Sequence, residues 1–347
     1  MKVLLVCAEP AGSFGGVQSY ARNLCRGLLQ IGHRALLVTP GGVYEPGVTV
    51  MPQGEFMQPR TWYRLLSEYR PDLVHLVDWQ SQFHLHHLFS GMPYVTSVFG
   101  AELLGVLRSP ERKGRLLRAL TSSLRIIAIS KYTACLLFNT MGIKGAHIAY
   151  PGIDVARFSA PQRRHNPGPS AVTVARLVPR KGQDMVIRAW PQVMKAFPSA
   201  TYVIVGTGPD EARLRAEAEK AKARVRFAGA VPCCSIAESY DLGQIYVMPC
   251  RQEGNSVEGF GLTFIEAGAR GLAVVGGRHG GAEEAVVHGK TGYLVQPFDT
   301  GELAQCIIRL LRDERLRDFL GEYGRARAKS EFDLAVSANR AYAGLLS

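Results

Sequence analysis

Short apolar runs alternate with helical patterns along almost the whole chain. In the first half, such runs predict strands at residues 3–7, 34–39, 73–77, 94–98, 126–129 and 145–149. In the second half, they predict strands at 171–174, 201–205, 225–228, 245–248 and 273–275, with helices at 183–197 and 211–222. This alternation is typical of parallel sheets that are covered by helices on both faces.

A polar, proline-rich segment at residues 161–169 interrupts the pattern and is the clearest linker signal. The chain has 347 residues, which exceeds the roughly 100–200 of one domain. We therefore predict two Rossmann-like, doubly wound α/β domains, residues 1–155 and 156–329. Two such units place a ligand cleft between them, at the carboxyl ends of the strands.

The composition fits a globular protein, with 47% hydrophobic and 20% charged residues. No apolar run approaches the ~20 residues of a membrane-spanning helix, and Glu9 and Pro10 interrupt the first run before it could serve as a signal peptide. The seven cysteines have no C-x-x-C spacing, so we expect neither a disulfide framework nor a zinc cluster. A cytoplasmic location is the simplest expectation.

The net charge of +12 indicates attraction to phosphate, to anionic substrates or to a negative surface. Part of it is concentrated at residues 108–131, which hold one acid, Glu111. A solvated helix face and a peripheral contact with an anionic membrane or acceptor are both open interpretations. Nucleic acid is not expected, because no aromatic residue interleaves with these cations before Tyr132. The cations are Arg108, Arg112, Lys113, Arg115, Arg118, Arg125 and Lys131.

Two turns that follow strands carry candidate anion sites. Gly15 and Gly16 open a helix after the first strand, so free N–H groups lie at a positive helix end. Arg176, Arg180 and Lys181 follow the first strand of the second half, where cations suit a diphosphate. A charged surface loop is the alternative for the second turn.

The most informative stretch runs from Glu258 to Glu266 around a glycine-rich turn. If the helix starts near Gly261, Glu258 stands in the loop and Glu266 lies about a turn and a half into the helix. The free N–H groups of the first turn then point at an anion between the two carboxylates. The alternative is an amphipathic helix with one exposed acid and one capping acid.

Together these residues resemble retaining glycosyltransferases of family 4, which have the GT-B fold, over nearly the whole chain. In the second half, residues 177–185 look most like those of phosphatidylinositol mannosyltransferases. The resemblance also implies that residues 330–347 return to the N-terminal domain. The matching residues are Gly15-Gly16, the segment 71–75, Ile129-Ser130, the segment 151–154, Arg176, Lys181, the segment 206–209, Glu258 and Glu266, Gly280-Gly281 and Thr291-Gly292.

The resemblance implies roles for the matching positions. Arg176 and Lys181 would bind the donor diphosphate, Glu266 the ribose and Glu258 a hydroxyl of the donor sugar. Gly16 would lie near the distal phosphate, as part of the Gly15-Gly16 loop. The backbone of Gly259, Phe260, Gly261 and Leu262 would contact phosphate or sugar, and that around Val231 the nucleobase. Family members generally work without a bound metal, so we expect no cofactor beyond a UDP- or GDP-linked sugar as substrate.

One position departs from the family pattern. Phe99 stands where the family usually has a histidine that meets the 6-hydroxyl of the donor sugar. A phenyl ring cannot form that hydrogen bond. The substitution therefore predicts a 6-deoxyhexose or pentose donor. Replacement by His75, His84, His86 or His87, another orientation of the hexose, and reduced activity are the alternatives.

In the expected reaction the acceptor hydroxyl attacks the anomeric carbon from the side of the departing diphosphate. Arg176, Lys181 and the helix start would stabilise charge on the leaving group. The N-terminal domain would bind the acceptor, whose identity the sequence does not reveal. A catalytically silent partner subunit that keeps its nucleotide pocket is an alternative, and so is a phosphorylase or an epimerase on the same architecture.

Overall fold

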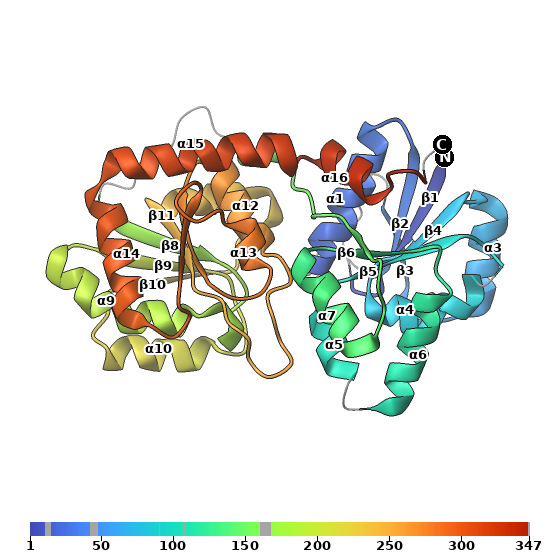
Figure 1. Ribbon diagram of the computed structural model, residues 1–347, viewed down its shortest axis with the longest axis horizontal. Helices are drawn as coiled ribbons and strands as arrows, with labels where there is room; N and C mark the ends of the chain where they lie inside the picture. Colours follow the sequence, from blue (N-terminus) through green and yellow to red (C-terminus); the bar gives the residue numbers. More distant parts are fainter. Residues whose placement is uncertain (11–14, 42–47, 90, 107–108, 160–167, 346–347) are drawn as a thin grey trace. The chain divides into compact units, whose positions relative to one another are not determined.

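The computed structural model describes residues 1–10, 15–41, 48–89, 91–106, 109–159 and 168–345. The predicted linker at 161–169 lies almost wholly outside these ranges, and Arg108 does too. Contacts divide the chain into two compact units (Figure 1). Unit 1 comprises Met1–Ile153 and Asp333–Ser347, and unit 2 comprises Asp154–Phe332. Among the helices so described, none is long and apolar enough to cross a membrane.

Unit 1 is built on a sheet of seven parallel strands in the order β3-β2-β1-β4-β5-β6-β7. The strands are β1 Lys2–Val6, β2 Arg34–Pro40, β3 Val48–Met51, β4 Leu73–Leu76, β5 Tyr94–Val98, β6 Arg125–Ala128 and β7 His147–Ile148. The flanking helices are α1 Gly16–Gln30, α2 Gln53–Phe56, α3 Pro59–Tyr69, α4 Trp79–Leu85, α5 Ala101–Gly105, α6 Pro110–Thr121, α7 Lys131–Met141 and α16 Leu334–Ala341. A 3-10 turn, His86–Phe89, follows α4.

Unit 2 contains a sheet of six parallel strands in the order β10-β9-β8-β11-β12-β13. The strands are β8 Ser170–Val174, β9 Thr201–Val205, β10 Val225–Gly229, β11 Ile245–Met248, β12 Ala273–Gly277 and β13 Gly292–Val295. The helices are α8 Val155–Phe158, α9 Gln183–Ala196, α10 Glu211–Lys220, α11 Ile236–Ser239, α12 Leu262–Ala269, α13 Ala282–Ala285, α14 Thr300–Arg312 and α15 Glu314–Glu331. Short 3-10 turns occupy Pro179–Lys181, Cys233–Ser235 and Tyr240–Leu242.

Every strand predicted from the sequence is present, and the two-sheet α/β fold is confirmed. Two four-residue strands, β3 and β13, were not predicted. The predicted helix at 211–222 ends two residues earlier, at Lys220, because Lys222 adopts a left-handed backbone with φ of 51°.

The C-terminal segment packs on unit 1 through α1. A side chain at Gly27 of α1 would lie 2.4 Å from the carbonyl oxygen of Leu334 and 2.9 Å from the Cβ of Ala338. A glycine at this position therefore lets α16 approach the backbone of α1 closely. The preceding helix, α15, runs to Glu331 in unit 2, so the return begins at residue 333.

Candidate functional site

A cluster of charged side chains forms in unit 2 at the carboxyl ends of β8 and β11, which are neighbours in the sheet. Lys181 follows β8, and Glu258 follows β11. The Lys181 ammonium lies 2.5 Å from Oε2 of Glu258, and Nη1 of Arg180 lies 2.5 Å from the same oxygen. The Lys181 and Glu258 side chains are about nine-tenths buried, so water screens this triad weakly.

The Glu258 carboxyl of this triad is ionised at neutral pH. Burial alone would raise the pKa of Glu258, but Lys181 and Arg180 outweigh burial and lower the pKa to about 2. Burial also lowers the pKa of Lys181, and Glu258 opposes that effect. Two cations and one carboxylate therefore leave one positive charge in excess.

Buried interactions fasten the Arg180-Lys181 turn to the loop after β11. The backbone N–H of Arg251 donates to the carbonyl of Arg180 at 2.9 Å. The Arg251 guanidinium makes a bidentate contact with the Asp184 carboxylate, at 2.8 and 3.1 Å. Both side chains of that pair are buried. The two segments that carry the triad are thus held together by more than the triad itself.

The glycine-rich turn before α12 depends on close backbone approaches. Gly261 has φ of 97° and is the N-cap of α12, as the sequence predicted. A side chain at Gly281 would lie 1.9 Å from the carbonyl oxygen of Gly259. The N–H of Gly281 donates to the carbonyl of Glu258 at 2.9 Å. These contacts fix the backbone on both sides of the turn.

The second carboxylate, Glu266, lies on α12 and accepts a hydrogen bond from the hydroxyl of buried Tyr240. Burial raises the pKa of Glu266, while Tyr240, Arg157 and Lys181 lower it. The ring of Tyr240 packs against Phe158, with centroids 5.9 Å apart. One oxygen of Glu266 is thereby held in a fixed direction.

The structure brings some of the predicted residues of unit 2 together. Lys181 and Glu258 are in direct contact, and Lys181 also influences Glu266 electrostatically. Arg176 is exposed after β8, and no carboxylate in the described ranges pairs with it. Val231 is half-buried after β10.

Sequence reasoning missed three contributors. The sequence identifies Arg180 as a cation but not as a partner of Glu258. Its position beside Lys181 was the signal that both could contact the same carboxylate. Tyr240 and Arg157 carried no signal, because their relation to Glu266 arises only from the folded chain.

The predicted residues of unit 1 follow the carboxyl ends of two strands of the same sheet, β1 and β5. Gly15 caps α1 after β1, and Gly16 is its first residue. Phe99 directly follows β5 and is half-buried. Its ring meets that of Tyr20 edge-on, with centroids 5.2 Å apart. In the sheet, only β4 separates β1 from β5.

His75 does not replace the missing family histidine. It is fully buried on β4, and both ring nitrogens are engaged, with the Tyr342 hydroxyl at 2.7 Å and the Ser97 hydroxyl at 2.8 Å. The ring therefore has no nitrogen left for a ligand. Nδ1 of His86 pairs with the Gln82 carbonyl at 2.7 Å.

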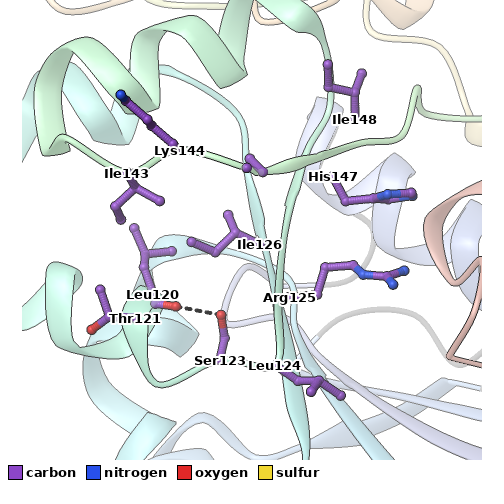
Figure 2. A pocket seen from close by; sticks show the side chains of 12 residues that line it. Leu120, Thr121, Ser123, Leu124, Arg125, Ile126, Ile143, Lys144, His147 and Ile148 are labelled. Carbon is purple, nitrogen blue, oxygen red and sulfur yellow. Dashed lines mark hydrogen bonds between the residues drawn. The ribbon is translucent and has the colours of Figure 1, made fainter.

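A hollow of about 580 Å³ is lined by residues at the amino ends of β6 and β7, and none of the predicted site residues lines it (Figure 2). Arg125 and His147 on its wall donate to carbonyls of the C-terminal segment, Ala343 at 2.7 Å and Arg340 at 2.6 Å. These two side chains thus hold the C-terminal segment. Within the described ranges, no group of three His, Cys, Asp or Glu residues could hold a metal ion.

Comparison with known proteins gives the class of this chain. The sucrose-phosphate synthase from Thermosynechococcus elongatus superimposes with a TM-score of 0.81 at 21% identity, over 97% of this chain and 96% of the other. Anabaena HepE in complex with UDP-glucose superimposes with a TM-score of 0.77 at 19% identity, over 98% of each chain. The two parallel sheets thus have the GT-B fold of glycosyltransferases.

Family models cover nearly the whole chain. The model of Glycosyltransferase Family 4 matches residues 14–157, and that of glycosyl transferases group 1 matches residues 156–327. The chain belongs to glycosyltransferase family 4.

A relative with a known acceptor type matches the C-terminal part. A GDP-mannose-dependent alpha-(1-6)-phosphatidylinositol monomannoside mannosyltransferase of Mycolicibacterium smegmatis is 35% identical over 212 residues. That match covers 57% of this chain and 55% of the relative, so it spans about half the length of each.

Proposed function

We propose that this protein transfers a sugar from a nucleoside-diphosphate sugar to an acceptor hydroxyl, with retention of configuration at the anomeric carbon. The observation that carries the proposal is the buried Arg180-Lys181-Glu258 triad beside the glycine turn of α12. A charged surface loop would have no reason to bury the ionised pair of Lys181 and Glu258. Family membership supports the same activity.

The donor would be held mainly by unit 2. Lys181 and Arg176 would bind the diphosphate, together with backbone N–H groups from Gly259 to Leu262. Because Tyr240 occupies one oxygen of Glu266, the other oxygen would accept from the ribose diol. Glu258 would orient a hydroxyl of the donor sugar, and the backbone around Val231 would contact the nucleobase.

The reaction breaks the bond between the anomeric carbon and the diphosphate oxygen and forms one to the acceptor oxygen. The acceptor proton passes to the leaving diphosphate, so no protein nucleophile is required. Lys181, Arg176 and the start of α12 would stabilise the charge that develops on the leaving group, by an effect of about 10²–10³ in rate for one such donor. As the family resemblance implies, we expect the reaction to need no metal.

Phe99 bears on the choice of donor sugar. If its ring takes the place of the family histidine, it favours a 6-deoxyhexose or a pentose. The buried and fully bonded state of His75 supports this preference, because it removes one substitute for the missing histidine. Turnover of matched donors by wild type and Phe99→His tests it. A wild-type preference for a full hexose that the substitution leaves unchanged would reject the idea.

The nucleobase and the acceptor follow only from relatives. The mannosyltransferase of M. smegmatis uses GDP-mannose, whereas HepE was solved with UDP-glucose. Both nucleotides therefore belong in any donor screen. A lipid-linked glycan is the acceptor class that the first of these names suggests.

We further propose that residues 108–131 contact an anionic membrane surface at the cytoplasmic side. The α6 side chains Arg112, Arg115 and Arg118 are exposed, and Arg115 pairs with the acid Glu111 at 2.9 Å. Sedimentation with phosphatidylglycerol vesicles should exceed that with phosphatidylcholine vesicles, and replacing the three arginines by glutamine should remove the difference. Equal sedimentation with both vesicle types would contradict this contact.

A thermal-shift panel of nucleoside diphosphates and nucleotide sugars, followed by donor-consumption assays, tests the main proposal. Lys181→Met should abolish the shift by the preferred nucleotide, whereas Lys195→Met, an exposed lysine of α9, should leave it intact. Binding without turnover over a broad acceptor set would instead indicate a silent partner subunit, which the loss of histidine at Phe99 would explain. Turnover that depends on phosphate, or product formed without an acceptor, would indicate a phosphorylase or an epimerase.

A further inference from the structure

A continuous chain of four buried polar side chains runs through unit 1. The Tyr20 hydroxyl lies 2.9 Å from Oγ of Ser97, which lies 2.8 Å from Nε2 of His75. Nδ1 of His75 lies 2.7 Å from the Tyr342 hydroxyl. Each of the four residues is at most 2% exposed. The chain links α1, β5 and β4 to the segment that follows α16.

The protons of this chain can be counted. Burial lowers the pKa of His75 to about 3, so its ring is neutral and carries one N–H. The three hydroxyls add one hydrogen each, which makes four donors for three contacts. Whichever direction the bonds take, one donor has no acceptor among the described residues.

The chain ends at Phe99. Ser97 precedes Phe99 by two residues, and its carbonyl accepts from Nε2 of buried Gln82 at 2.7 Å. Tyr20 contacts the Phe99 ring edge-on. Ser97 is therefore held through both its side chain and its backbone, and Tyr20 transmits that position to the ring of Phe99.

We propose that Tyr342, His75 and Ser97 are positioning residues that act through Tyr20 to fix the ring of Phe99, and thereby set discrimination between donors at carbon 6 of the sugar. The inference rests on the proposed function, in which Phe99 contacts the donor sugar. It assigns a role in donor choice to a residue near the C-terminal end of the chain.

The direction of the bonds shows why Tyr342 matters. When its hydroxyl donates to Nδ1, the N–H of His75 must lie on Nε2 and must point at Ser97. Without that hydroxyl, the proton can move to Nδ1, and Ser97 no longer receives a fixed donor. Tyr20 and then Phe99 lose their restraint.

Tyr342→Phe removes only this hydroxyl. Tyr94→Phe is the matched control, because Tyr94 is also buried in unit 1 and its hydroxyl donates to the Ala119 carbonyl at 2.8 Å. For two donors that share a nucleotide and differ only in the 6-hydroxyl, we expect Tyr342→Phe to change the ratio of kcat/KM by about fivefold, the worth of one ordinary hydrogen bond. Tyr94→Phe should leave the ratio unchanged. Equal ratios in both variants and wild type would overturn the proposal.

A second measurement does not depend on turnover. Nitrogen-15 spectra of labelled histidine report the tautomer of His75. Carbon-13 spectra of labelled phenylalanine report the environment of the Phe99 ring, whose resonance is identified by its absence in Phe99→Leu. We expect both signals to shift in Tyr342→Phe and to stay in place in Tyr94→Phe. If no donor is turned over but both signals shift, the proposed function fails and the positioning chain stands. If neither signal shifts, the positioning chain fails.

Discussion

Replacing Glu258 by glutamine removes one charge from the buried triad and keeps the shape of the side chain. In the folded chain, burial opposes ionisation of this carboxyl, but Lys181 and Arg180 lower its pKa from 4.5 to about 2. A pKa difference of this size corresponds to about 3 kcal/mol of the free energy of unfolding of unit 2. Because the folded pKa is lowered, this contribution is fully present above pH 4.5 and is lost as the pH falls towards 2.

We therefore expect Glu258→Gln to destabilise unit 2 by about 3 kcal/mol at pH 7. Urea unfolding followed by the fluorine resonance of 5-fluorotryptophan at Trp190 reports on unit 2, because the other tryptophans, Trp62 and Trp79, lie in unit 1. Glu253→Gln is the control. Glu253 lies in the same loop and pairs with Arg251 at 3.1 Å, but its side chain is 52% exposed, so the loss should stay below about 1 kcal/mol.

The same substitution should change nucleotide affinity in the opposite direction. Glu258 and a diphosphate would compete for Lys181 and Arg180, so the neutral variant should bind the free nucleoside diphosphate about tenfold more tightly, while turnover falls because the sugar hydroxyl loses its partner. Isothermal titration gives the affinity. The reasoning is refuted if Glu258→Gln is no less stable than Glu253→Gln, or if it binds the diphosphate more weakly than wild type.

Three further outcomes follow from the same contacts. Tyr240→Phe removes the hydrogen bond that lowers the pKa of Glu266, so a larger fraction of Glu266 should be protonated at pH 6 than in wild type. Nucleotide affinity measured by calorimetry should therefore fall more at pH 6 than at pH 8. An equal loss of affinity at both pH values would contradict a role of Glu266 in the ionised form. Gly261→Ala places a side chain at φ of 97°, and the melting temperature should drop by an amount equivalent to about 1–3 kcal/mol. An unchanged melting temperature would show that the turn relaxes freely. Burial lowers the pKa of His75 to about 3, so wild type should lose about 2 kcal/mol of its free energy of unfolding through this residue between pH 7.5 and 5. Urea unfolding of His75→Gln should lack this loss. Parallel curves of stability against pH for the two proteins would contradict a contribution from His75.

The sequence was sufficient for most of the strands because they appear as short apolar runs between turn residues. The start of α12 could be predicted because glycine is needed where φ is positive, as it is at Gly261. Strands β3 and β13 were not predicted; each is a four-residue strand at an edge of its sheet.

The contacts within the candidate site could not be predicted, because they depend on which strands are neighbours. Lys181 and Glu258 were each assigned to the donor, yet their contact joins residues 77 positions apart through the pairing of β8 with β11. Tyr240 reaches Glu266 across 26 positions, from the turn before β11 to the helix that follows it. A single sequence states the chemistry of these side chains but not the strand order that brings them together.

Residues 333–347 belong to unit 1 but follow unit 2 in the sequence, and this order matters while the chain is being synthesised. All of unit 2 is synthesised before α16. The face of α1 at Gly27, which α16 covers in the folded protein, therefore stays uncovered until α16 has been made. A nascent chain that stalls after residue 332 would hold all of unit 2 and an incomplete unit 1. Chaperones and proteases that act during synthesis would then encounter the uncovered surface of α1 in the N-terminal half.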